Sequence, residues 1–191
     1  MAGYAERHGS VAVNPGDNHL MVAAFDGTAA ELYPPPGVPP GPDIASFVTL
    51  VNLPRRIGLL LARRGGFAVG VADGTELTRS KVDSRYVQSR TAAGGWSQQR
   101  FARRRENQAK AAAGAAADVA AELLLPAVDQ LSTVVGGGDR RAVGAILADR
   151  RLEPVAAKLA DRFLDVPDPR QAVLRDAVRQ ARAVRIRLTE P

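Results

Sequence analysis

Short apolar runs separated by turn-forming residues predict strands in the first part of the chain. Residues 11–13 and 20–25 form two such runs, each followed by Asn, Pro, Gly or Asp at a turn. Residues 34–42, with the sequence PPPGVPPGP, predict a proline-rich surface loop in extended conformation. The next segment, DIASFVTLVNLP, fits two structures: Asp43 could cap a short helix, whereas the β-branched residues favour a strand.

A three-stranded meander is predicted next. Continuous apolar runs at 57–62 and 67–72 are typical of buried strands, and a Gly-Gly pair lies between them. An Asp-Gly turn then leads into a third strand over 76–82.

Helical spacing dominates the second half of the chain. Ser97 is predicted to cap a long helix that Pro126 ends, because alanine and leucine recur at helical spacing from Phe101 onward. The stretch LSTVVGGGD predicts a strand, a glycine turn and a helix from about 139 to 149, with Asp139 as its N-cap.

The end of the chain, from RFLDVPDP onward, predicts a further strand and then a closing amphipathic helix over 169–184. This order of strands and helices predicts an α/β fold, with helices packed on a mixed sheet. The length of 191 residues fits a single domain over 1–191, which includes the proline-rich loop.

The formal net charge of +6 is concentrated in one segment. Residues 79–110 contain nine Arg or Lys and only two Asp or Glu, whereas residues 1–78 contain five basic and seven acidic residues. Residues 111–191 are nearly balanced, with twelve basic and eleven acidic residues. Such a local excess indicates a polyanionic partner, although a solvated helix face is the alternative.

Composition sets further limits. A hydrophobic fraction of 46% is typical of a globular core, and the absence of cysteine excludes disulfides and Cys-ligated metals. No uninterrupted apolar run reaches the roughly 18 residues of a membrane span, and the N-terminus lacks a signal-peptide pattern. We therefore expect a cytoplasmic protein with no membrane partner.

Conventional catalytic groups are scarce. The histidines, His8 and His19, lie far in sequence from the basic segment, and Asp165 and Asp168 lie in a turn-rich context that is a poor metal site. The glycine run before Asp139 lacks the Lys-Ser/Thr of a phosphate-binding loop. We predict no metal and no cofactor. The remaining polar groups are the side chains of glutamine, serine, tyrosine and arginine, and the backbone amides. These groups suit attack by water on a substrate that is held mainly by another molecule.

The basic segment, SKVDSRYVQSRTAAGGWSQQRFARRRENQ, resembles the core motif of the Vms-like release-factor family. The similarity is greatest to the actinobacterial and chloroflexi branch, described as peptidyl-tRNA hydrolases. It extends more weakly through RRGGFAVGV, LLPAVDQLSTVVGGGD and FLDVPDPRQAVLRDAVRQARAVRIRL. The family is related to the middle domain of archaeal and eukaryotic class I release factors, so the resemblance implies a ribonuclease-H-like architecture.

The resemblance also implies a catalytic glutamine. Class I release factors carry it directly after two glycines, where this chain has Trp96, but the Vms-like family uses a Gly-x-x-Gln arrangement. That spacing matches Gln98, and the adjacent Gln99 is the alternative. The loop that presents it comprises Gly94, Gly95, Trp96 and Ser97.

These residue types suit hydrolysis of the peptidyl-tRNA ester. A neutral amide can orient water and donate a hydrogen bond without bringing a negative charge among RNA phosphates. The two glycines allow close approach to RNA, and Trp96 either stacks on a base or anchors the loop in its own domain. The residues expected to contact RNA phosphates are Arg90, Arg100, Arg103, Arg104, Arg105 and Lys110.

The function implied is a ribosome-associated peptidyl-tRNA hydrolase that releases nascent chains from stalled large subunits. Its expected partners are the large ribosomal subunit, peptidyl-tRNA and ribosomal RNA, without DNA. Two alternatives remain open at this point. One is a non-catalytic module that binds RNA or the ribosome, and the other is an enzyme that cleaves tRNA near its 3′ end.

Overall fold

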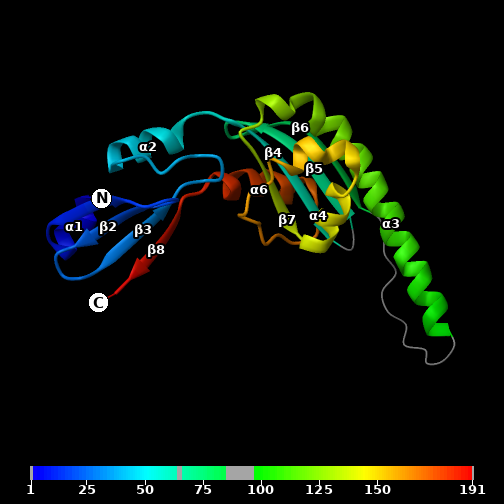
Figure 1. The fold of residues 1–191 in the computed structure, drawn as a ribbon, viewed down its shortest axis with the longest axis horizontal. Coiled ribbons are helices and arrows are strands. Elements are labelled where there is room, and N and C mark those ends of the chain that lie inside the picture. Colours follow the sequence, from blue (N-terminus) through cyan, green and yellow to red (C-terminus); the bar gives the residue numbers. More distant parts are fainter. Residues whose placement is uncertain (1, 64–65, 85–96, 191) are drawn as a thin grey trace. The chain divides into compact units, whose positions relative to one another are not determined.

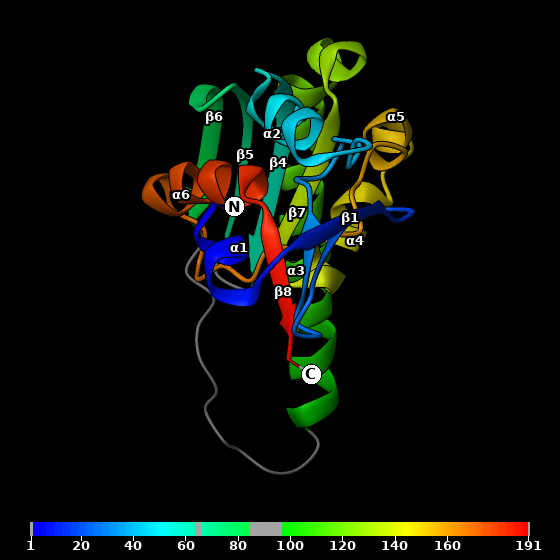
Figure 2. The same cartoon turned by 90° about the vertical axis from the view of Figure 1, so that its left-hand side faces the viewer.

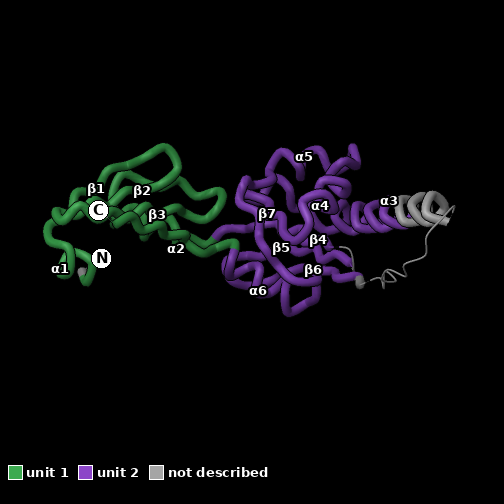
Figure 3. Tube along the Cα trace, turned by 90° about the horizontal axis from the view of Figure 1, so that it is seen from below, with its two compact units in different colours: residues 1–54, 181–191 green, residues 55–180 purple. Residues whose placement is uncertain are grey.

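The computed structural model describes residues 2–63, 66–84 and 97–190, which form two compact units. Unit 1 comprises residues 1–54 and 181–191, and unit 2 comprises residues 55–180 (Figure 3). Each unit has its own sheet and its own buried cluster. That residues 1–191 act as a single domain stays a prediction.

Unit 1 is built on a four-stranded antiparallel sheet with the order β1-β2-β3-β8. Its strands are β1 (Val11–Pro15), β2 (Leu20–Ala24), β3 (Ala29–Tyr33) and β8 (Arg185–Thr189). Its helices are α1 (Ala2–His8) and α2 (Ile44–Asn52). The buried cluster consists of alternate residues of β2 and β3 together with one residue of α2: Leu20, Val22, Ala30, Leu32 and Phe47.

Residues 43–54, whose sequence fitted either a helix or a strand, contain the helix α2. The carboxylate of Asp43 accepts a hydrogen bond from the backbone N–H of Ser46 at 2.8 Å, which satisfies a free amide at the helix start. Phe47 is buried against the sheet. The capping interpretation is confirmed, and the expected proline-rich loop precedes it without helix or strand over residues 34–42.

Unit 2 contains a mixed sheet with the order β6-β5-β4-β7, whose four strands lie side by side in Figure 2. The strands are β4 (Arg56–Arg63), β5 (Gly66–Asp73), β6 (Glu76–Ser84) and β7 (Thr133–Gly138). β4 pairs antiparallel with β5, which pairs antiparallel with β6, and the other edge of β4 pairs parallel with β7. Both the predicted meander and the predicted mixed α/β fold are confirmed.

Helices cover both faces of this sheet, which explains the unbroken apolar runs of its central strands. Leu60 and Val69 face a cluster that includes residues of α3 (Ser97–Leu124) and α4 (Arg140–Leu147). Gly70 points to the opposite face, where a Cβ would lie 3.1 Å from Leu174 of α6 (Gln171–Arg182). Short helical turns join these elements: η1 (Leu125–Gln130), η2 (Arg150–Leu152) and α5 (Glu153–Ala156).

Helix α3 begins at Ser97 and changes character along its length. The side chains of residues 108–111 are exposed, whereas Ala116, Ala117 and Ala120 are buried in unit 2. Residues 108–130 are long and apolar enough to cross a membrane, with a mean hydropathy of 1.5, although a core helix of a soluble protein passes the same test. The buried alanines fit the core-helix explanation.

Of the two predictions near the C-terminus, the strand is wrong and the closing helix is confirmed. The segment containing Leu164 forms a single isolated bridge to β7, at Gly137, and the neighbouring Pro167 and Pro169 lack the N–H groups that a ladder needs. The closing helix, predicted over 169–184, is α6 over 171–182, and the strand β8 that follows it was not predicted. Helix α1 was not predicted.

Candidate functional site

One end of the mixed sheet carries the connection to α3. Ser84, the last residue of β6, is paired with Gly66, and Gly66 is paired with Arg63 at the end of β4. β7 ends beside them, because Ala62 is paired with Gly138. We call this edge the loop end, defined by Arg63, Ser84 and Gly138, and the opposite edge the far end.

Helix α3 reaches well beyond the loop end (Figure 1). The ammonium of Lys81 lies 3.1 Å from the carboxylate of Glu122, which sets α3 against β6 near the end of that strand. From Ser97 to Glu122 an α-helix rises about 38 Å, whereas Lys81 to Ser84 cover only about 10 Å of strand. The first turn of α3 therefore lies roughly 25 Å past the sheet, by this difference in rise.

The predicted glutamines lie in this first turn. Ser97, Gln98 and Gln99 begin α3, and successive residues of an α-helix project about 100° apart. Arg90, Gly94, Gly95 and Trp96 lie outside the described residues.

The predicted basic residues follow along the same helix. Arg100 and Arg104 lie within α3, and Gln108 follows at the same four-residue interval. Lys110 is exposed. The other basic positions that α3 contains are Arg103 and Arg105.

A hollow of about 450 Å³ opens at the loop end, and sequence reasoning did not find it. Two arginines from different elements line it: Arg63 ends β4, and Arg140 begins α4. The Arg140 guanidinium carbon lies 4.4 Å from the centre of the Phe163 ring, a cation–π contact that holds this side chain. The remaining lining residues are Gly138, Asp139 and Asp168.

Close contact between β4 and β7 requires glycine here. Gly138 has φ +91°, and a Cβ on it would lie 2.4 Å from the carbonyl oxygen of Ala62 and 2.9 Å from Cγ of Arg63. The next residue, Asp139, caps α4 as predicted: its carboxylate accepts hydrogen bonds from the amides of Arg141 at 2.8 Å and Ala142 at 3.4 Å.

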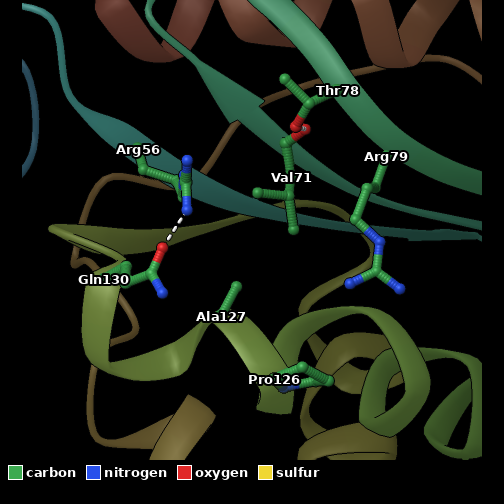
Figure 4. Close-up of a pocket in the computed structure, with 7 residues that line it drawn as sticks. All are labelled: Arg56, Val71, Thr78, Arg79, Pro126, Ala127 and Gln130. Atoms are coloured by element: carbon green, nitrogen blue, oxygen red, sulfur yellow. Dashed lines mark hydrogen bonds between the residues drawn. The ribbon is translucent and has the colours of Figure 1, made fainter.

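The far end has a smaller hollow of about 300 Å³, between the sheet and η1 (Figure 4). Here Arg56 is held: its guanidinium lies 2.7 Å from the carboxylate of Asp73 and donates to the side-chain oxygen of Gln130. Arg79 extends from β6 into the same region. The other lining residues are Val71, Thr78, Pro126 and Ala127.

The shifted carboxylates lie outside the loop-end hollow. Hydrogen bonds from the Arg151 side chain and backbone lower the pKa of Asp149 to about 2. In unit 1, hydrogen bonds from Thr28, and then from His8, lower the pKa of Asp26 to about 2. His8 thus takes part in a local contact, 2.8 Å from Asp26.

Metal-binding clusters are absent from the part of the chain that the structure describes, which holds no group of three or more His, Asp or Glu suited to a metal ion. The polar groups that line the loop-end hollow are the guanidinium groups of Arg63 and Arg140 and the carboxylates of Asp139 and Asp168.

Comparison with known families gives one match over most of the chain. A sequence model of the actinobacteria/chloroflexi VLRF1 release factor family matches residues 55–187. The chain belongs to this family. The match covers the mixed sheet, α3 and the loop end, and membership of a release-factor family indicates a role in translation termination or on the ribosome.

The similarity of this chain to solved structures is weak. No curated protein matches. An archaeal translation termination factor, aRF1, is 16% identical, with a TM-score of 0.46 over 94% of this chain and 52% of its own. A structure titled archaeal protein is also 16% identical, with a TM-score of 0.43 over 81% of this chain and 48% of its own. The VLRF1-family chain thus spans about half the length of each.

Proposed function

We propose that this VLRF1-family protein is a peptidyl-tRNA hydrolase that releases nascent chains on the large ribosomal subunit. The observation that carries the proposal is that Gln98, the glutamine of a Gly-x-x-Gln sequence, is the second residue of α3. Gln98 lies in the first turn of a helix that extends past the loop end, within a chain that belongs to a release-factor family.

The reach of α3 suits a buried substrate. A single helix with its side chains is about 10–12 Å wide, so it can enter an RNA-walled channel that excludes a whole domain. The ester of peptidyl-tRNA lies in such a channel in the large subunit. A tip roughly 25 Å beyond the sheet would meet the ester while the mixed sheet stays outside.

Gln98 acts in this proposal by positioning water. Its side-chain oxygen accepts a hydrogen bond from the water, and its amide N–H or a nearby backbone N–H donates to the developing oxyanion. The amide stays neutral, so the surrounding phosphates do not repel it as they would repel a carboxylate. Arg100, Arg103 and Arg104 hold the helix on RNA through phosphate contacts, as residues of this spacing can from one side of a helix.

The partners follow from this chemistry. They are ribosomal RNA of the large subunit and the acceptor end of peptidyl-tRNA, and the protein works in the cytoplasm, where ribosomes are found. A stalled large subunit that still carries peptidyl-tRNA is the proposed substrate. No metal or cofactor is part of the mechanism.

The experiment is release of a labelled peptide from purified large subunits that carry peptidyl-tRNA. We expect the wild-type protein to yield free peptide and a tRNA of full length. Free tRNA shortened at its 3′ end, with the peptide still esterified to the fragment, would replace the hydrolase with a tRNA nuclease. Binding to the subunits without either product would reduce the protein to an RNA-binding module.

A further inference from the structure

We propose that the loop-end hollow is a second RNA contact, in which Arg63 and Arg140 bind backbone phosphate. The inference rests on the proposed function, because it assumes an RNA partner at this end of the sheet. It adds a binding site formed by two residues that are far apart in sequence and outside the basic segment 79–110.

Charge is the first support. Among the residues that the structure describes, neither Arg63 nor Arg140 forms an ion pair, whereas Arg56, Arg151, Arg179 and Arg187 each have a carboxylate partner. The two guanidinium groups of the hollow keep the hydrogen-bonding capacity that phosphate oxygens require. Arginine suits this role because its planar fork matches the geometry of a phosphate.

Preorganisation is the second support. The contact with the Phe163 ring restrains the Arg140 guanidinium, and Arg63 lies against Gly138, where a larger residue would collide with its side chain. Both arginines begin from the ends of regular elements of unit 2. Restrained side chains lose less conformational entropy when they bind a ligand.

The two acids in the hollow have different effects. The Oδ1 atom of Asp139 accepts hydrogen bonds from the backbone amides of Arg141 and Ala142, so this oxygen faces the start of α4. Asp168 is exposed and has no ion pair with Arg63 or Arg140 among the described residues. A phosphate in the hollow would be repelled by Asp168. Removal of this negative charge should therefore strengthen RNA binding, whereas removal of the arginines should weaken it.

Position is the third support. The hollow lies at the edge of the sheet from which α3 extends, so RNA that surrounds α3 passes close to Arg63 and Arg140. The phosphate belongs either to ribosomal RNA or to the acceptor arm of tRNA. Because the chemistry is the same, binding to each RNA must be measured separately.

The test compares three proteins for binding to vacant large subunits and to free tRNA at several salt concentrations. The first is the double variant Arg63→Gln/Arg140→Gln. The second is a matched control, Arg150→Gln/Arg175→Gln, which removes the same charge from two exposed arginines that have no ion pair among the described residues. The third is Asp168→Asn.

We expect the first variant to weaken binding and to reduce the slope of log affinity against log salt by about 1.5 more than the control does. Asp168→Asn should tighten binding two- to five-fold. Weaker binding of the double variant to vacant subunits assigns the phosphate to ribosomal RNA. Weaker binding to tRNA alone assigns it to the acceptor arm. Arg63→Gln alone, which leaves the Phe163 contact intact, should give about half of the slope change.

Slopes equal to those of the control, or weaker binding by Asp168→Asn, would overturn the inference. These outcomes are separate from failure of the proposed function. If wild-type protein binds RNA but releases no peptide, the proposed hydrolase function is wrong. The salt dependence of the variants still shows whether the hollow binds phosphate. If wild-type protein binds neither RNA, both proposals fail.

Discussion

At the far end of the mixed sheet, Arg56 is joined to Asp73 and Gln130, whereas at the loop end Arg63 and Arg140 form no ion pair with any residue that the structure describes. Both ends therefore carry two arginines beside a hollow. At the far end Arg56 is engaged by a carboxylate and only Arg79 has no ion pair with a described residue, whereas at the loop end this holds for both arginines. A count of arginines alone would treat the two ends alike. The difference lies in the partner that each guanidinium already has.

The same comparison separates stability from function. An arginine with a carboxylate partner contributes mainly to the folded state, and an exposed pair of this kind contributes little. An arginine without such a partner adds to the positive potential that attracts a polyanion. We therefore expect loss of the Arg56 side chain to change unfolding and loss of the Arg63 and Arg140 side chains to change RNA binding.

The largest expected effect concerns the basic face of α3. Replacing Arg100, Arg103 and Arg104 with Ala should weaken binding to large subunits and lower the slope of log affinity against log salt by about 2 to 3, because each lost phosphate contact removes about 0.7 to 0.9. Titrations of labelled protein at several salt concentrations measure this. An unchanged slope would place the RNA contact elsewhere in the molecule.

The next effect concerns the backbone of the loop end. Gly138→Ala should destabilise the protein by about 1–3 kcal/mol, because a Cβ at positive φ also meets the carbonyl oxygen of Ala62. Gly144→Ala is the matched control within α4, where a Cβ meets nothing within 4 Å and alanine favours the helix. Urea unfolding compares them. Equal stability of the two variants would show that β4 and β7 tolerate a side chain at this point.

A smaller effect is expected at the far end. Arg56→Gln should lower the free energy of unfolding by at most about 1 kcal/mol, since the ion pair with Asp73 is partly exposed. It should leave the salt dependence of RNA binding unchanged. A reduced salt slope in this variant would contradict the distinction between the two ends.

The smallest effect is a pH dependence near α4. Arg151 holds the pKa of Asp149 at about 2, below its ordinary value of 3.8, so the charged carboxylate stabilises the fold above pH 4 and loses this effect as the pH falls towards 2. Asp149→Asn keeps a capping side chain but removes the charge. The difference in unfolding midpoint from wild type should shrink between pH 5 and pH 2. A difference that stays constant over this range would exclude the ion pair as its cause.

Local sequence signals predicted much of unit 2. The unbroken apolar runs gave β4 and β5, and Asp139 was placed correctly as a helix cap because its side chain acts on the next few amides. The strand over residues 185–189 was not predicted, since their apolar spacing continues that of α6. Only pairing with β3, distant in sequence, makes them a strand.

The candidate site likewise has one part that is local in sequence and one part that depends on distant residues. The Gly-x-x-Gln motif is contiguous, so the sequence alone points to Gln98. The hollow combines Arg63 with Arg140, which the parallel pairing of β4 and β7 brings to one edge. No local pattern contains that pairing, so the hollow could not be predicted before the sheet was known.

The central claim is that Gln98 positions the water that attacks peptidyl-tRNA, and a single-turnover release assay on large subunits tests it most directly. Gln98→Ala should reduce the release rate by about 10²–10³, as loss of one oxyanion donor does in other enzymes. Gln99→Ala is the matched control, because it projects about 100° away along the same helix. We predict near-normal release for Gln99→Ala and unchanged subunit binding for both variants. Full release by both single variants and by the double variant would contradict the account.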